Sequence, residues 1–145
     1  MNACDQLIQE ASAAAGASLA WLLSPWLVDV THQAIAEQAE RAVDALTTWP
    51  DDSGIAAPIV VACTGTMDPP PEWWASPLGV LCARHFVTDE RLITRRVAAA
   101  MLGIAPGTLS PILARGNSRL RRAESGELVA GSVFAEVAYR AEVVR

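Results

Sequence analysis

The stretch from Leu92 to Arg122 constrains the fold most, because its apolar residues form two helical stripes separated by a single glycine. The stripes are Val97, Ala98, Met101 and Leu102, followed by Ile104, Leu109, Ile112 and Leu113. This spacing is typical of amphipathic helices. Gly103, between the stripes, can adopt the left-handed conformation that closes a helix. The spacing therefore predicts two helices joined by a sharp turn at Leu102-Gly103-Ile104.

Residues near that turn favour a helix-turn-helix. Ala99, four residues before the glycine, is small enough to let the second helix cross closely. Thr94 is a suitable cap for the first helix, and Pro106 suits the first turn of the second. Pro111 lacks an amide hydrogen, so a helix that begins at Pro106 should be kinked. Alternatively, the second helix begins later, with Ser110 as its cap.

Positive charge is concentrated in the same stretch. The seven arginines between residues 91 and 122 are Arg91, Arg95, Arg96, Arg115, Arg119, Arg121 and Arg122. No acidic residue lies among them, although the whole chain has a net charge of -5. Such a focused positive patch is typical of a phosphate-binding surface. The alternative interpretation is an ordinary alanine-rich helical hairpin with solvated arginines.

The run LITRRVAAAMLGIAPGTLSPILARG, followed by SRLRRAESGELVAGSVFAEVA, resembles the small winged helix-turn-helix domains of excisionases and MerR-type regulators. In those families a short strand ending in threonine leads into the first helix, and a two-stranded wing follows the recognition helix. The resemblance covers residues 92–145. It implies that Arg115-Gly116 ends the recognition helix, that Leu120–Val129 forms the wing with a turn at Ser125-Gly126, and that Ser132 caps the last helix.

The resemblance implies binding to double-stranded DNA. The residues expected at the DNA are Thr94, Arg95, Arg96, Pro106, Thr108, Ser110, Arg115, Arg119, Arg121 and Arg122. The arginines of the first helix would contact phosphates, and those of the wing would reach phosphates or the minor groove. Around Ala105–Pro111 the recognition helix offers few of the long donors that read bases. Contacts to phosphates and DNA shape are therefore expected to dominate.

The N-terminal half has the opposite charge. Residues 1–85 carry ten acidic residues and two arginines, a sum of -8, whereas residues 86–145 carry six and nine, a sum of +3. Residues 1–23, with Asn2 as a cap, and a segment from Ser24 to about Trp49 are predicted to pair as a helical hairpin. Its apolar surface exceeds what one partner helix covers. We therefore expect a homodimer, or else packing of Trp21 and Trp26 inside the monomer.

The composition changes in the middle of the chain. Turn and proline clusters indicate a connector over residues 51–75, in which the apolar run IAAPIVVA is of undetermined type. Ser76-Pro77 begins another helix, and Trp73 and Trp74 anchor the connector onto the domain that follows. Residues 129–144 alternate enough for a strand, but alanine and glutamate favour a helix.

These segments predict a mainly α fold with three parts. An acidic helical hairpin spans residues 1–50 and mediates dimerisation or partner binding. A proline-rich connector spans residues 51–75. A winged helix-turn-helix domain with a small β wing spans residues 76–145.

Sequence motifs for catalysis are absent. There is no Gly-rich phosphate loop, HExxH or G-x-S-x-G, and only His32 and His85 can act as histidine bases. We therefore expect no enzyme activity, catalytic residue or cofactor.

The cysteines also favour an intracellular, metal-free chain. Cys4, Cys63 and Cys82 form no C-x-x-C pair, which fits reduced thiols in the cytoplasm. Cys82 and His85 could begin a zinc site, but buried thiols and a surface histidine are the simpler interpretation. We expect no metal.

A membrane span is not expected either. The uncharged run Ala11–Val28 is interrupted by Ser24-Pro25, and no basic residue precedes it.

The sequence thus predicts a small cytoplasmic DNA-binding protein, either a transcriptional regulator or an accessory factor of a phage or mobile element. Its acidic half would dimerise or recruit a protein partner. The alternative is a protein-interaction adaptor whose degenerate helix-turn-helix does not bind DNA. Salt dependence of DNA binding separates the two, because phosphate contacts release counterions.

Overall fold

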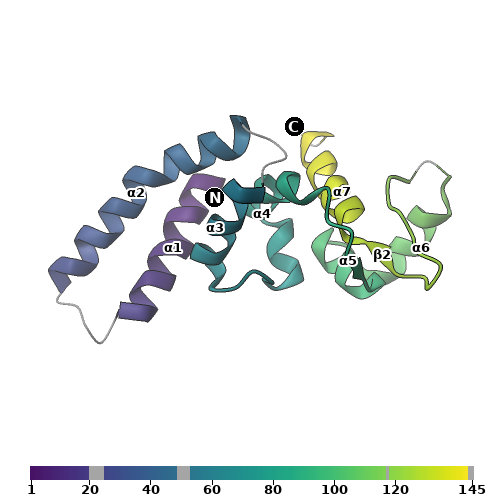
Figure 1. Ribbon diagram of the computed structural model, residues 1–145, viewed down its shortest axis with the longest axis horizontal. Helices are drawn as coiled ribbons and strands as arrows, with labels where there is room; N and C mark the ends of the chain where they lie inside the picture. Colours follow the sequence, from purple (N-terminus) through teal and green to yellow (C-terminus); the bar gives the residue numbers. More distant parts are fainter. Residues whose placement is uncertain (20–24, 49–52, 117, 144–145) are drawn as a thin grey trace. The chain divides into compact units, whose positions relative to one another are not determined.

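The chain folds into a mainly helical structure with one small antiparallel sheet (Figure 1). The computed structural model describes residues 1–19, 25–48, 53–116 and 118–143, without the side chains of 16–32. Two compact units are present, Met1–Pro69 and Pro70–Arg145. The mainly α class predicted from the sequence is confirmed. Among the described residues, no single helix has the length and apolarity needed to cross a membrane.

The described part of the first unit consists of the helices α1 (Ala3–Leu19), α2 (Pro25–Thr48) and α3 (Ser53–Thr64). Asn2 caps α1 as predicted, since its Oδ1 accepts a hydrogen bond of 2.8 Å from the amide of Asp5. Each helix contributes a buried side chain to the core, including Leu7, Leu46 and Val60. Some of the expected positions lie outside the described residues, namely the cap Ser24, Trp21, Trp49 and the side chain of Trp26.

Helix α3 occupies much of the segment that was expected to be a connector. The prediction of a connector over residues 51–75 is wrong for 53–64, because Ala56 and Val60, one turn apart, are fully buried in the first unit. This burial holds the helix despite Pro58 inside it. The helix ends at Thr64, and the next residue, Gly65, has a left-handed φ of 73°.

In the described residues of the second unit, the elements are two short 3-10 helices, two strands and four α-helices. They are η1 (Pro71–Ala75), α4 (Pro77–Ala83), η2 (Arg84–Phe86), β1 (Leu92–Ile93), α5 (Arg95–Met101), α6 (Pro106–Ala114), β2 (Leu128–Val129) and α7 (Ala130–Val143). The strands pair antiparallel, with Leu92 opposite Val129 and Ile93 opposite Leu128.

An aromatic cluster occupies the core of the second unit. Trp74 packs edge-on against Phe86 at 5.6 Å and against Phe134 at 4.7 Å between ring centroids. Trp73 lies 5.1 Å from Trp74 in a similar geometry. Such pairs add about 0.5–1.5 kcal/mol each beyond burial of their area. Trp74 is buried in this core, but η1 belongs to the second unit, so the predicted connector is also wrong for residues 71–75.

The N-terminus of α7 is bonded to a distant part of the chain. The amide of Ala130 donates to the carbonyl of Arg91 at 2.8 Å, and that of Gly131 donates to Asp89 at 2.7 Å. Because these carbonyls satisfy the first amides, α7 begins at Ala130 without a side-chain cap. The predicted cap at Ser132 is therefore wrong, whereas the choice of helix over strand for this segment is confirmed.

Ser132 joins α7 to the segment before β2. Its hydroxyl donates to the carbonyl of Val129 at 2.7 Å and accepts from the amide of Arg121 at 2.9 Å. The residue is 6% exposed, so both bonds are sheltered from water. Ser132 thus holds both ends of the segment 121–129 against α7.

We expect Gly131→Ala to lower the free energy of unfolding by about 1–3 kcal/mol, as overpacking usually does. A Cβ there would lie 2.3 Å from the carbonyl oxygen of Val87. Gly107→Ala is the matched control, because no atom lies within 4 Å of its Cβ position in α6. Urea denaturation of both variants tests this, and equal stabilities would contradict it.

Candidate functional site

The chain turns sharply between α5 and α6. Gly103 has a φ of 64°, and its amide donates to the carbonyl of Ala100 at 3.0 Å. The amide of Ile104 donates to the carbonyl of Ala99, also at 3.0 Å. This pair of bonds is the Schellman motif, which satisfies carbonyls at a helix C-terminus. The two helix axes differ by 97°, so the predicted turn at Gly103 is confirmed.

The start of α5 and its crossing with α6 also agree with the prediction from the sequence. Thr94 caps α5, since its hydroxyl oxygen accepts a hydrogen bond of 3.3 Å from the amide of Val97. Ala99 of α5 and Leu109 of α6 are both fully buried. Together α5 and α6 would be long and apolar enough for a bent membrane span, but their apolar faces are buried within this unit.

Helix α6 is continuous through Pro111. It begins at Pro106, as the first alternative expected, so a start with Ser110 as cap is wrong. Burial of Leu109 holds the first turn in helical conformation. The carbonyl that loses its bond to residue 111 belongs to Gly107, which is exposed and can bond to water.

One face of α6 is uncovered in the second unit and carries no charge. The exposed residues of α6, together with the preceding Ala105, are Ala105, Pro106, Gly107, Thr108, Ser110, Pro111 and Ala114. The hydroxyls of Thr108 and Ser110 are the polar side-chain groups of this helix. The small side chains allow another surface to approach the helix backbone closely.

Residues 121–129 form a hairpin, here called the 121–129 hairpin. Arg122 is bridged to Leu128, and the amide of Ala123 donates to the carbonyl of Glu127 at 2.8 Å. Its turn runs from Ala123 to Gly126, which has a φ of 89° and includes the expected Ser125-Gly126. The carbonyl of Gly126 accepts a hydrogen bond of 3.4 Å from Nε of Arg95, which connects the hairpin to the start of α5.

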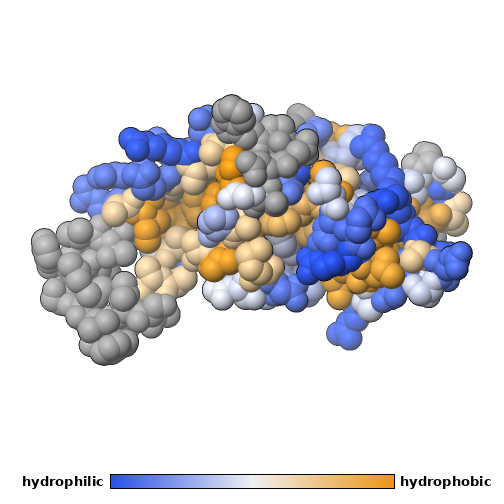
Figure 2. All heavy atoms as spheres, viewed as in Figure 1, coloured by the Kyte–Doolittle hydropathy of each residue, from blue (hydrophilic) through white to orange (hydrophobic). Residues whose placement is uncertain are grey.

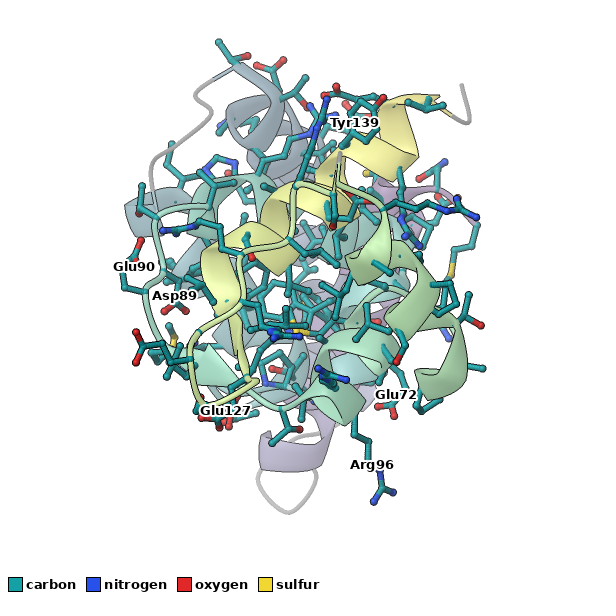
Figure 3. The ribbon with its side chains drawn as sticks, turned by 90° about the vertical axis from the view of Figure 1, so that its right-hand side faces the viewer. Glu72, Asp89, Glu90, Arg96, Glu127 and Tyr139 are labelled. Atoms are coloured by element: carbon teal, nitrogen blue, oxygen red, sulfur yellow. The ribbon has the colours of Figure 1, made fainter. Side chains whose placement is uncertain are left out.

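Two of the arginines form ion pairs. Arg91 binds Asp89 at 2.7 Å, and Arg121 binds Glu90 at 2.8 Å. Both acids lie at the same edge in Figure 3. Partial burial acts to raise the pKa of the Asp89 carboxyl, but the hydrogen bonds and charge of Arg91 lower it below its ordinary value. The acid-free stretch 91–122 is therefore partly neutralised by the residues just before it.

A third arginine is held by an aromatic ring. The guanidinium of Arg119 lies 3.5 Å from the ring centroid of Tyr139 on α7. This cation–π contact leaves the charge in place but fixes the side chain. No local sequence signal predicts this pair, because the two residues are twenty positions apart.

The other arginines of the stretch are Arg96, Arg115 and Arg122. All three are exposed, and within the described part of the unit their side chains have no hydrogen-bond or ion-pair partner. Arg96 points away from the ribbon in Figure 3. Arg115 is the C-cap residue of α6, and Arg122 lies in the 121–129 hairpin. These side chains are available to an anionic ligand.

Metal-ligating side chains do not gather in the described residues, where no group of three or more His, Cys, Asp or Glu side chains could hold a metal ion. Burial and the nearby Glu10 carboxylate raise the pKa of the Cys63 thiol to about 12, so the thiol is protonated at neutral pH. His85, expected at the surface, is 2% exposed, because η2 turns it into the second unit.

We expect Gly103→Ala to destabilise the chain by about 1–2 kcal/mol, the cost of a left-handed conformation for a residue with a Cβ. The nearest atom to that Cβ would be 3.5 Å away, so the cost arises from the backbone and not from crowding. Gly116→Ala, at a site with free space and no positive φ, should be close to neutral. Thermal unfolding measures both; a neutral Gly103→Ala would show that the turn does not need glycine.

Comparisons with known proteins give no relative for this chain. No protein-family model matches it. No curated protein and no solved structure matches it significantly either.

Proposed function

We propose that residues 92–143 form a winged helix-turn-helix that binds double-stranded DNA. In this proposal α5 and α6 are the two helices of the motif, and the 121–129 hairpin is the wing. The angle of 97° between α5 and α6 supports it, since helix-turn-helix pairs cross at about 90–120°. The order of β1, capped α5, turn, α6, hairpin and α7 also fits the resemblance to excisionases and MerR-type regulators.

The observation that carries the proposal is the exposed, acid-free α6 between unpartnered arginines. In the DNA-bound state, α6 would lie in the major groove, where Ala105 and Gly107 permit close approach. The Thr108 and Ser110 hydroxyls would then bond to base edges or phosphates. Arg96, Arg115 and Arg122 would neutralise phosphates on either side.

The remaining expected contacts have different roles. Thr94 caps α5, and Pro106 starts α6, so both position the motif. Arg95 is bonded to the hairpin turn, and Arg119 is stacked on Tyr139. Arg121 is paired with Glu90 and reaches DNA only when that pair opens. Sequence specificity is then modest, because the donors that read bases are few.

We expect DNA affinity to fall with salt with a log–log slope of about -3, because each phosphate contact contributes about -0.9. Arg96→Ala, Arg115→Ala and Arg122→Ala should each weaken binding on all duplexes alike and reduce the slope by about 1. Arg91→Ala is the control, since that side chain is engaged by Asp89. Fluorescence anisotropy with duplexes of random and of genomic neighbouring sequence measures the affinities.

An absence of binding at low salt on every duplex would contradict this function and favour the second candidate. That candidate is a protein-interaction adaptor. It is supported by the uncharged face of α6 and by the two acidic residues that form ion pairs with Arg91 and Arg121. Such a face suits an apolar protein partner better than a polyanion.

The Glu90–Arg121 pair gives a separate test. Glu90→Gln should free Arg121, raise DNA affinity severalfold at low salt and make the slope more negative by about 0.9. Glu124→Gln is the matched control, because it removes the same charge from an exposed residue without a side-chain partner in the described unit. Equal effects of the two variants would show that only net charge matters.

A further inference from the structure

The exposed face of α6 has few groups that can form hydrogen bonds with a base. The helical period places four residues at the centre of this face, on the side away from the buried Leu109. They are Gly107, Ser110, Pro111 and Ala114. The sequence of α6, PGTLSPILA, contains no Arg, Lys, Asn or Gln, which are the residues that usually read bases. The centre of the face therefore consists of a proline ring, a methyl group, a bare glycine backbone and one hydroxyl.

Positive charge lies outside this face. Arg115 directly follows Ala114 at the end of α6, Arg96 lies in the first turn of α5, and Arg122 lies in the 121–129 hairpin. All three arginines are exposed. In Figure 2, pale and orange residues lie at α6, with strongly hydrophilic residues beside them. The complementary ligand is anionic at its edges and apolar at its centre.

The major groove of duplex DNA has this arrangement wherever it contains thymine. Phosphates follow both edges of the groove, and the base edges between them are polar except for the C5-methyl group of thymine. A polar base edge covered by a proline ring loses its water without gaining a hydrogen bond, which is unfavourable. A methyl group in the same place gains from being removed from water. An apolar helix face therefore favours thymine over cytosine.

We propose that α6 selects A·T-rich duplexes by burying thymine C5-methyl groups against Pro111 and Ala114. This inference rests on the proposed function, because it requires α6 to lie in the major groove. Gly107 allows the helix backbone to come close to the bases, since the space at its Cβ position is open. The Ser110 hydroxyl is both donor and acceptor, so it can bond to the polar edge of either base of a pair.

A preference for A·T pairs has a second possible cause, which changes in the DNA can separate from methyl contacts. A narrow minor groove in A-tracts attracts arginine, so the 121–129 hairpin could also favour A·T pairs. Replacing thymine by deoxyuridine removes the methyl group but keeps the hydrogen-bonding groups and the minor-groove edge. Replacing cytosine by 5-methylcytosine adds a methyl group at the same position of a G·C pair. Methyl contacts are sensitive to both replacements.

Fluorescence anisotropy of the full chain measures the Kd for four duplexes of equal length at one salt concentration, so that the phosphate contribution is constant. The duplexes are A·T-rich, the same with deoxyuridine for thymine, G·C-rich, and the same with 5-methylcytosine for cytosine. Each lost methyl contact should weaken binding about fourfold, as expected for one buried methyl-sized group. The A·T-rich duplex should therefore bind about tenfold more tightly than its deoxyuridine form, and 5-methylcytosine should restore part of the affinity lost with G·C pairs.

Variants of α6 test the residues in the contact. Pro111→Ser should reduce the ratio of the deoxyuridine Kd to the thymine Kd about threefold, since one apolar contact is lost. Together with Ala114→Ser it should bring the ratio close to one. Pro77→Ser is the matched control, because it makes the same change at an exposed proline in the first turn of α4. A ratio of two affinities does not change when a variant only lowers stability or phosphate binding.

Three outcomes would overturn the inference and leave DNA binding intact. They are equal affinity for the thymine and deoxyuridine duplexes, a preference for G·C pairs, and equal ratios for Pro111→Ser and Pro77→Ser. Failure of the unaltered chain to bind any of the four duplexes at low salt would instead contradict the proposed function, and the inference with it.

Discussion

The second unit depends on the hydrogen bonds at the N-terminus of α7. The first amides of a helix have no partner within it, and here Ala130 and Gly131 donate theirs to the carbonyls of Arg91 and Asp89. Ser132 adds a bond to the amide of Arg121. These contacts bring the segment before β1 and the 121–129 hairpin to one point. Strand β1 begins directly after Arg91 and β2 ends directly before Ala130, so the β1–β2 pairing lies at that junction.

The same junction determines how much positive charge the unit presents. It places Asp89 and Glu90 beside Arg91 and Arg121, although the stretch from 91 to 122 contains no acid of its own. The Arg121–Glu90 pair is exposed on both sides, and pairs of this kind contribute only about 0–1 kcal/mol to stability. The ion pairs lower the positive electrostatic potential of the unbound protein more than they stabilise its fold.

The two units present surfaces of different chemistry. In the second unit the exposed face of α6 is small and neutral, and unpartnered arginines lie on the elements around it. In the first unit Glu37, Glu40 and Asp44 of α2 are exposed, and the uncharged α3 borders an open apolar groove. Electrostatic attraction dominates recognition at the first kind of surface and burial of apolar area at the second. The second unit is thus suited to an anionic partner and the first unit to an apolar one.

Local signals in the sequence determined much of the second unit. Gly103, the Thr94 cap and Pro106 act within a few residues of themselves, so the turn and the helix starts could be predicted. Only the tertiary structure decided the rest, because it depends on residues far apart in the chain. Residues 53–64 are apolar without a clear period, and burial of Ala56 and Val60 makes them helical. The start of α7, the partners of Arg119 and Arg121, and the groove likewise exist only where separate segments meet.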